Sequence, residues 1–145
     1  MYVKKVISFF IMALILSGCT SEDENISSES VTKEDTYIFT GSNENWEVSY
    51  EVDVINKGQS ENQVDENGTV KFIGEDEIPE MIDYKLATET GLNSSEGTGT
   101  PIYDGVGGFA QGSCGNCIPV EVDEKLELEI IWNGKSEKIV LTADE

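Results

Sequence analysis

The chain has 145 residues, with 29 acidic side chains against 9 basic ones and a formal net charge of −20. It contains no histidine and no arginine, which excludes Ser-His-Asp and Cys-His catalytic sites and histidine-ligated zinc or copper. So strong a negative charge also opposes contact with phosphate backbones, and we expect no nucleic-acid partner.

The N-terminal segment has the order of a secretory signal peptide. Two lysines precede an apolar stretch over residues 6–16, and the run Leu16-Ser17-Gly18-Cys19 closes it. The stretch is too short to span a bilayer, which takes about 20 apolar residues. This pattern resembles bacterial lipoproteins, in which a diacylglyceryl group is joined to the cysteine sulfur and the preceding peptide is removed. The resemblance implies a signal peptide over 1–18 and a lipid anchor on Cys19, at the outer face of the cell membrane.

Lipidation of Cys19 also accounts for the odd number of cysteines. Three cysteines in an exported chain leave one thiol unpaired, and assigning Cys19 to lipid leaves Cys114 and Cys117 as a pair. Apart from the covalent diacylglycerol, with palmitate expected among its acyl groups, we expect no cofactor and no metal. Removal of residues 1–18 takes away two lysines and no acid, so the formal charge moves from −20 to −22.

The segment from Cys19 to Asp35 is polar and acidic, with two isolated aliphatic residues. Such a segment cannot bury enough apolar surface to offset the entropy lost on ordering. We therefore predict a disordered acidic tether over residues 19–35 and a single folded domain over residues 36–145.

The first strands of this domain are predicted from alternation of apolar and polar residues. A weak candidate at Tyr37 to Thr40 precedes a strong one at Trp46 to Val54, where every second residue is apolar or aromatic. That period of two is typical of a strand with one face on the core. Two further weak candidates follow at Thr69 to Ile73 and at Met81 to Ala87.

Two acidic segments near these strands carry the carboxylates that calcium prefers. Asp65-Glu66-Asn67-Gly68 has some character of a calcium loop, but Gln63 stands where an aspartate is needed and Gly74 where the closing glutamate belongs. We interpret Asn67-Gly68 as a turn. We interpret Glu75-Asp76-Glu77 as a solvated loop, with weak divalent-cation binding as the alternative.

The segment from Thr90 to Gly115 holds many of the 14 glycines, including Gly97-Thr98-Gly99-Thr100 and Gly105-Val106-Gly107-Gly108. The spacing and the Lys-Ser/Thr ending of a P-loop are absent, and the dinucleotide fingerprint requires a following helix that no helical period predicts. We predict a long flexible loop. Because long loops on rigid sheets often carry function, a binding site there stays open.

Cys114 and Cys117 are the one pair of residues whose spacing suggests chemical reactivity. A C-x-x-C pair exchanges disulfides when one thiol has a depressed pKa, as at the N-terminus of a helix. Here the following segment, Ile118 to Val122, is a strand candidate, and nearby carboxylates would raise a thiol pKa. We predict a structural disulfide, with a redox pair and soft-metal binding as alternatives.

The C-terminal end predicts a β-hairpin. Leu126 to Trp132 alternates like a strand, Asn133-Gly134 follows, and the chain resumes as a strand from Ser136 to Leu141. Asn-Gly suits the two positive φ angles of a type I′ turn. Short strands, turns and no helical period predict an all-β fold, a single antiparallel β-sandwich of immunoglobulin-like type with about seven strands; a small barrel is the alternative. Trp46 and Trp132 are then core anchors.

Three segments carry a further resemblance: Phe39 to Tyr50 with its Gly-Ser-x-x-Asn-Trp pattern, Cys114-Gly115-Asn116-Cys117, and the ending Ile131-Trp132-Asn133-Gly134-Lys135. Together they look like small uncharacterised lipoproteins of Gram-positive bacteria. The resemblance spans most of the domain and implies location and architecture, but no activity.

Two classes of function follow. The favoured hypothesis is a lipid-anchored, extracytoplasmic and non-enzymatic module that binds or supports an envelope protein or ligand, with the membrane contacted through the lipid. The alternative is a membrane-tethered thiol-disulfide protein acting through Cys114 and Cys117.

Overall fold

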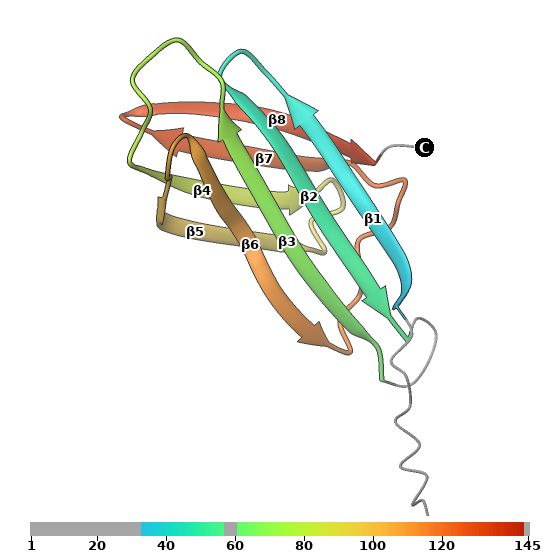
Figure 1. Ribbon diagram of the computed structural model, residues 1–145. Helices are drawn as coiled ribbons and strands as arrows, with labels where there is room; N and C mark the ends of the chain where they lie inside the picture. The colour runs from blue at the N-terminus through green and yellow to red at the C-terminus, as the bar shows by residue number, and fades with distance from the viewer. Residues whose placement is uncertain (1–32, 57–60, 144–145) are drawn as a thin grey trace, which may run out of the picture. The chain divides into compact units, whose positions relative to one another are not determined.

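The computed structural model describes residues 33–56 and 61–143, which form eight antiparallel strands and no helix (Figure 1). The predicted signal peptide over 1–18, Cys19 and most of the predicted tether lie outside these residues. The strands are β1 (Lys33–Ser42), β2 (Trp46–Ile55), β3 (Gln63–Phe72), β4 (Met81–Thr88), β5 (Ser94–Pro101), β6 (Val106–Gly115), β7 (Leu126–Trp132) and β8 (Lys135–Ala143).

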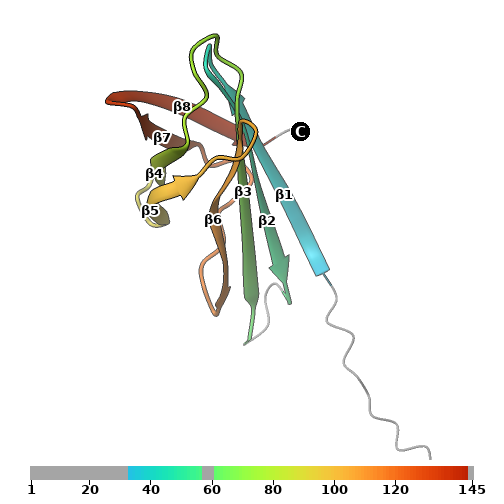
Figure 2. The ribbon, with the colours of Figure 1, turned by 60° about the vertical axis from the view of Figure 1, so that its left-hand side comes forward.

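The strands form two packed layers that are joined at one corner. One layer has the order β5-β4-β7-β8 and the other the order β1-β2-β3-β6. Strands β8 and β1 pair only at Phe39↔Ala143 and Thr40↔Thr142, so one eight-stranded sheet folds over on itself and comes close to a barrel. Figure 2 shows the two layers from the side. The predicted all-β, immunoglobulin-like sandwich is confirmed at the level of its architecture.

The core lies between the layers and is built from the alternating side chains. In β2 the side chains at every second position from Trp46 to Val54 are buried, as the period of two predicts. Trp46 is fully buried and packs edge-on against Phe72, at 5.1 Å between ring centroids, and against Trp132, at 5.3 Å. Both tryptophans are therefore core anchors, as predicted.

The predicted C-terminal hairpin is also confirmed. Strands β7 and β8 pair from Leu126↔Leu141 to Trp132↔Lys135. Between them Asn133 and Gly134 have φ angles of 46° and 76°, which are the two positive values that a type I′ turn requires.

The glycine-rich segment is not a flexible loop, and that prediction was wrong. It forms β5 and β6, which lie at the two ends of the sheet order. Side chains lie directly over the glycine backbone here: an added Cβ would collide with the Tyr84 ring at Gly97 and with the Ile102 side chain at Gly107. The glycines therefore make room for packing within strands. This also explains why the described residues form eight strands and not about seven.

Two further predictions were wrong, one of a strand and one of a turn. Ile118 to Val122 is not a strand, because Pro119 has no N–H to donate to a ladder and the segment instead places Val120 alone in the core. Asn67-Gly68 is not a turn but lies inside β3. A glycine is required at this position because the ring of Phe109 packs directly over the backbone of Gly68 and leaves no room for a side chain.

The domain begins earlier than predicted. Strand β1 starts at Lys33, so residues 33–35 of the predicted tether belong to the sheet. Their backbone pairs with the end of β2, with Lys33 opposite Ile55 and a register shift before Asp35. Backbone pairing thus extends the strand through residues whose polar character alone predicts no burial.

The connections of the sandwich are divided between two ends. The turns at 43–45, 73–80, 102–105 and 133–134 gather at one end, which we call the distal end (Figure 1). Hydrogen bonds link them, among them Phe72 N–H to Gly105 O at 2.7 Å and Ile73 N–H to Asn45 O at 2.8 Å. Strand β1 begins at the opposite end, the proximal end, where β6 also finishes.

Candidate functional site

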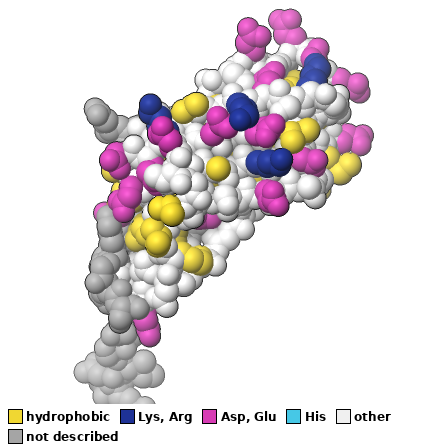
Figure 3. All heavy atoms as spheres, turned by 180° about the vertical axis from the view of Figure 1, so that it is seen from behind, with side chains coloured by type: hydrophobic (Ala, Val, Ile, Leu, Met, Phe, Trp, Pro, Cys, Tyr) yellow, Lys and Arg dark blue, Asp and Glu magenta, His cyan; other side chains and the backbone are white. Residues whose placement is uncertain are grey.

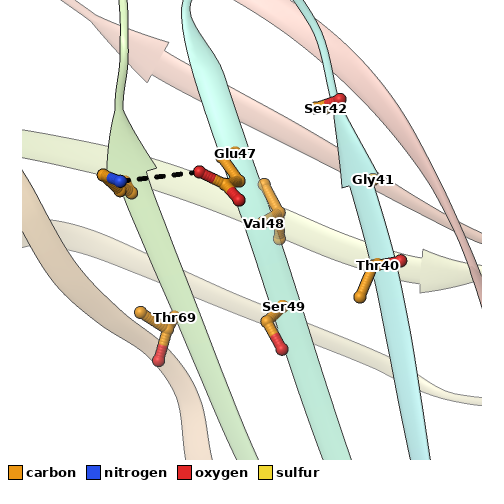
Figure 4. Close-up of a pocket in the computed structure, with 8 residues that line it drawn as sticks. Thr40, Gly41, Ser42, Glu47, Val48, Ser49 and Thr69 are labelled. Atoms are coloured by element: carbon orange, nitrogen blue, oxygen red, sulfur yellow. Dashed lines mark ion pairs between the residues drawn. The ribbon is translucent and has the colours of Figure 1, made fainter.

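A shallow groove of about 450 Å³ crosses the outer face of β1, β2 and β3 (Figure 4). The strand register creates it by aligning short side chains in one row, with Thr40 opposite Ser49 and Ser49 opposite Thr69. The neighbouring row carries longer side chains that stand above this floor. The lining residues are Thr40, Gly41, Ser42, Glu47, Val48, Ser49, Thr69 and Lys71.

One ion pair forms the wall of the groove towards the distal end. Glu47 lies opposite Lys71 in the ladder, and their Oε2 and Nζ atoms are 3.7 Å apart. Both side chains are more than half exposed, so the pair is screened by water and contributes little to stability. Hydroxyl groups both donate and accept hydrogen bonds, and the wall adds one cation and one carboxylate. This set suits reversible hydrogen bonding to a polar ligand.

The outer face of the other layer has mixed charge (Figure 3). Its lysines stand among carboxylates: Lys138 pairs with Glu127 at 2.6 Å, and the Ser136 hydroxyl donates to Glu129 at 2.7 Å. The hydrogen bond and charge of Glu127 raise the pKa of Lys138 above its ordinary value. The charged side chains of this face are solvated and pair with one another. The groove on the opposite layer is therefore the better candidate site.

Cys114 and Cys117 form a disulfide that closes the end of β6, as predicted. Cys114 stands opposite Val64 of β3, and Cys117 packs against the core. Two hydrogen bonds fasten the loop that follows: Asn116 N–H donates to Asn62 O at 2.7 Å, and Asn62 Nδ2 donates to Cys117 O at 2.9 Å. The bridge therefore lies at a strand end and not at a helix start.

A polar pair lies inside the sandwich. Burial, then the charge of Glu66 and the hydrogen bond with it, raises the pKa of Tyr50, so the phenol stays neutral and donates to the carboxylate. A small cavity of about 60 Å³ adjoins the pair. Close by, Ala110 at a bulge of β6 donates its N–H to the hydroxyl of Tyr84 at 3.0 Å. These contacts satisfy polar groups within the core.

The carboxylates of the two acidic segments considered for calcium binding do not converge on one site in the structure. Asp65 and Glu66 are neighbours in β3 and point to opposite faces of the sheet. The loop with Glu75-Asp76-Glu77 is exposed, and Asp76 pairs with Lys135. Within residues 33–56 and 61–143, no three His, Cys, Asp or Glu side chains are grouped so as to hold a metal ion.

The predicted lipidation residue, Cys19, lies outside the described residues, and so does the predicted signal peptide. In the part of the chain that the structure describes, no helix has the length and apolar character needed to cross a bilayer.

Comparisons of the chain with protein-family models, with curated proteins and with solved structures found no match. The resemblance to small lipoproteins of Gram-positive bacteria therefore stays a prediction that rests on the residues quoted for it.

The structure gives the Gly-Ser-x-x-Asn-Trp segment a local role. Asn43 Oδ1 accepts from the backbone N–H of Asn45 at 3.0 Å and of Trp46 at 2.9 Å, which shapes the β1–β2 turn. The side-chain amides of Asn43 and Asn45 both donate to the carboxylate of Glu137 in β8, at 2.7 and 2.6 Å. The segment thus fastens one layer to the other, a role that needs no ligand.

Sequence reasoning missed the groove because its residues carry no motif. Ser49 and Thr69 occupy ordinary outward positions of amphipathic strands, and only the cross-strand register brings them into one row. The signal that existed was weak: a single short hydroxyl residue, Ser49, stands between the charged outward residues Glu47 and Glu51 of β2.

Proposed function

We propose that this protein is a lipid-anchored extracytoplasmic lipoprotein whose β-sandwich acts as a non-enzymatic binding or accessory module at the cell membrane. The observation that carries the proposal is the run Leu16-Ser17-Gly18-Cys19 behind a short apolar stretch and two lysines. The disulfide supports it, because Cys114 and Cys117 use two of the three cysteines and Cys19 is the one that remains.

Under this proposal the domain is attached through its proximal end, where β1 begins at Lys33. The fourteen residues from 19 to 32 can span at most about 50 Å when fully extended. Two acyl chains hold a protein at a bilayer firmly, whereas one chain is marginal. The distal turns and the groove then face the surroundings, and the groove offers a place for a polar envelope ligand.

Cys19→Ala should release the protein from membranes or leave its signal peptide uncleaved, because the acyl chains are the proposed anchor. Membrane fractionation and intact-mass measurement of the mature chain test this. As a matched control, Cys114→Ser with Cys117→Ser should remain in the membrane fraction. A Cys19→Ala chain that lacks residues 1–18 and still sediments with membranes would refute the proposal.

The alternative function is that of a membrane-tethered thiol-disulfide protein. The observation in its favour is the disulfide itself, with Cys114 exposed at the end of an outer strand. Among the residues that the structure describes around it, none forms a helix N-terminus, which is the feature that lowers a thiol pKa in dedicated exchangers.

Measuring the reduction potential of the Cys114–Cys117 pair separates the two functions. A structural disulfide should have a potential below about −300 mV, whereas values of about −270 to −120 mV belong to exchange proteins. Cys114→Ser with Cys117→Ser should lower the free energy of unfolding by about 2 kcal/mol, because the loop is short and the entropy gained in the unfolded chain is small. An exchanger-like potential would favour the alternative.

A further inference from the structure

Four large apolar side chains are exposed together at the distal end. Ile73 is 45% exposed, Ile78 51%, Tyr103 75% and Val106 42%. We call these four residues the distal patch. They come from the connection between β3 and β4 and from the β5–β6 turn with the first residue of β6, and the two segments are neighbours although they are about thirty residues apart in sequence.

Backbone contacts hold the distal patch in a fixed arrangement. Tyr103 and Val106 exchange both hydrogen bonds, at 2.8 and 2.9 Å, around a turn in which Asp104 and Gly105 have positive φ. Because they form a bridge, their side chains lie on the same side of the turn. The Gly105 carbonyl accepts from Phe72 N–H, which brings Ile73 beside the turn.

Ile78 completes the patch from the other side. Its Cδ1 atom lies 3.8 Å from the position that a Cβ on Gly105 would occupy, so it covers the backbone of the turn. Because the patch is built on hydrogen-bonded backbone, its apolar side chains need little reordering to meet a partner. Exposed apolar residues that are grouped and rimmed by polar ones mark interaction sites in soluble domains.

The rim of the distal patch is acidic. Six exposed carboxylates stand on the same turns or beside them, and in the described part of the chain only one of them, Asp76, forms an ion pair, with Lys135. The cations nearest to the patch, Lys71 and Lys135, are both held by carboxylates, Glu47 and Asp76. The six are Glu44, Glu75, Asp76, Glu77, Glu80 and Asp104.

We propose that the distal patch is a docking surface for a basic segment of a protein partner, one that carries large apolar side chains between lysines or arginines. The inference rests on the proposed binding function and adds a protein-binding surface that is separate from the groove. The acidic rim steers a cationic partner to the site, because five of its six carboxylates form no ion pair among the described residues, and the apolar centre supplies affinity once water is excluded.

The same charges decide against other occupants. A second copy of the chain would bring two acidic rims together, and each mature chain carries a formal charge of −22 once residues 1–18 are removed. An anionic bilayer repels the rim in the same way. A cationic protein segment is the occupant that satisfies both the apolar centre and the rim.

Nuclear magnetic resonance of residues 19–145 carrying Cys19→Ala tests the proposal without the lipid. The probe is a synthetic peptide with a Trp-Leu-Ile centre flanked by lysines, and its matched control has glutamates in place of the lysines. We expect the lysine peptide to shift amide signals at the distal patch and its rim and the glutamate peptide to leave them in place. Added salt should weaken binding, because the rim acts by charge.

A pair of variants checks that the patch itself binds. Ile78→Ser with Tyr103→Ser should weaken binding of the lysine peptide at least about tenfold. The control is Leu92→Ser with Ile118→Ser, two residues that are 72% and 68% exposed on loops away from the distal end and whose change should leave affinity unaltered. All four side chains are exposed, so each variant is expected to fold.

Three outcomes overturn the inference: no binding of the lysine peptide up to about 1 mM, shifts centred on Leu92 and Ile118, or concentration-dependent self-association through the distal patch. Because residues 19–145 with Cys19→Ala carry no lipid, these outcomes leave membrane anchoring untouched. Loss of anchoring by Cys19→Ala in cells is likewise independent of the peptide result.

Discussion

Trp46→Ala should lower the free energy of unfolding by about 3–5 kcal/mol. Trp46 is fully buried, and its ring meets Phe72 and Trp132 edge-on, so truncation leaves a large cavity where the two layers meet. A loss of this size is a large part of the 5–15 kcal/mol that holds a typical domain folded. Urea denaturation followed by circular dichroism measures it.

Two controls sharpen this test. Tyr103→Ala removes an aromatic ring that is 75% exposed and should leave stability within about 0.5 kcal/mol of the original. Trp46→Phe should cost less than Trp46→Ala, because the indole N–H of Trp46 has no hydrogen-bond partner among the described residues and only volume is lost. A loss below about 1 kcal/mol for Trp46→Ala would show that the tryptophan is not a core anchor.

Gly68→Val should lower the free energy of unfolding by about 3 kcal/mol or more. A Cβ at Gly68 would lie 2.5–2.6 Å from three ring atoms of Phe109. That ring cannot move aside, because it is buried and packed between Tyr50, at 5.9 Å, and Tyr84, at 5.5 Å. Thermal and urea denaturation of the variant measure the loss.

The chain offers a matched control for this substitution. Gly112 lies in β6, next to β3, and a Cβ there meets no atom within 4 Å. Gly112→Val should therefore be neutral or slightly stabilising, since valine favours strands. Equal losses for the two variants would contradict the packing explanation and point to backbone flexibility as the reason for both glycines.

The strands that the sequence predicts well are those in which alternation of apolar and polar residues already implies which face is buried. Trp46 to Val54 and Leu126 to Trp132 each carry large apolar side chains at every second position, so burial on one face follows directly from the pattern. The Asn133-Gly134 turn is predicted equally well, because its positive φ angles are a local requirement.

Strands β5 and β6 could not be predicted in the same way, because the side chains that cover their glycines lie outside these two strands. At Gly97 of β5 the side chain that covers the backbone is Tyr84 of β4, and at Gly107 of β6 it is Ile102 of the preceding turn. Composition near Gly97 and Gly107 predicts a loop until these covering side chains are placed over the glycines. The segment Ile118 to Val122 shows the reverse error, since its alternation exists but only Val120 meets the core.

The candidate site depends on register to an even greater degree. The Glu47–Lys71 pair and the hydroxyl row of the groove join residues from three strands, and no spacing along the chain predicts which of them are neighbours. The disulfide was predictable because Cys114 and Cys117 are close in sequence, so that little chain has to be placed before they can meet.

The pairing of β1 with β8 sets the order in which this protein can fold. Phe39 and Ala143 are opposite each other in the ladder although more than a hundred residues separate them in the chain. Such a contact closes a very long loop, and folding slows as contacts become less local. The meander β1-β2-β3 and the hairpin β7–β8 can form early from local pairs, but the two layers cannot join until β8 has been synthesised. In a chain that leaves the ribosome or a translocation channel from its N-terminus, the two layers would therefore stay unpaired until β8 emerges.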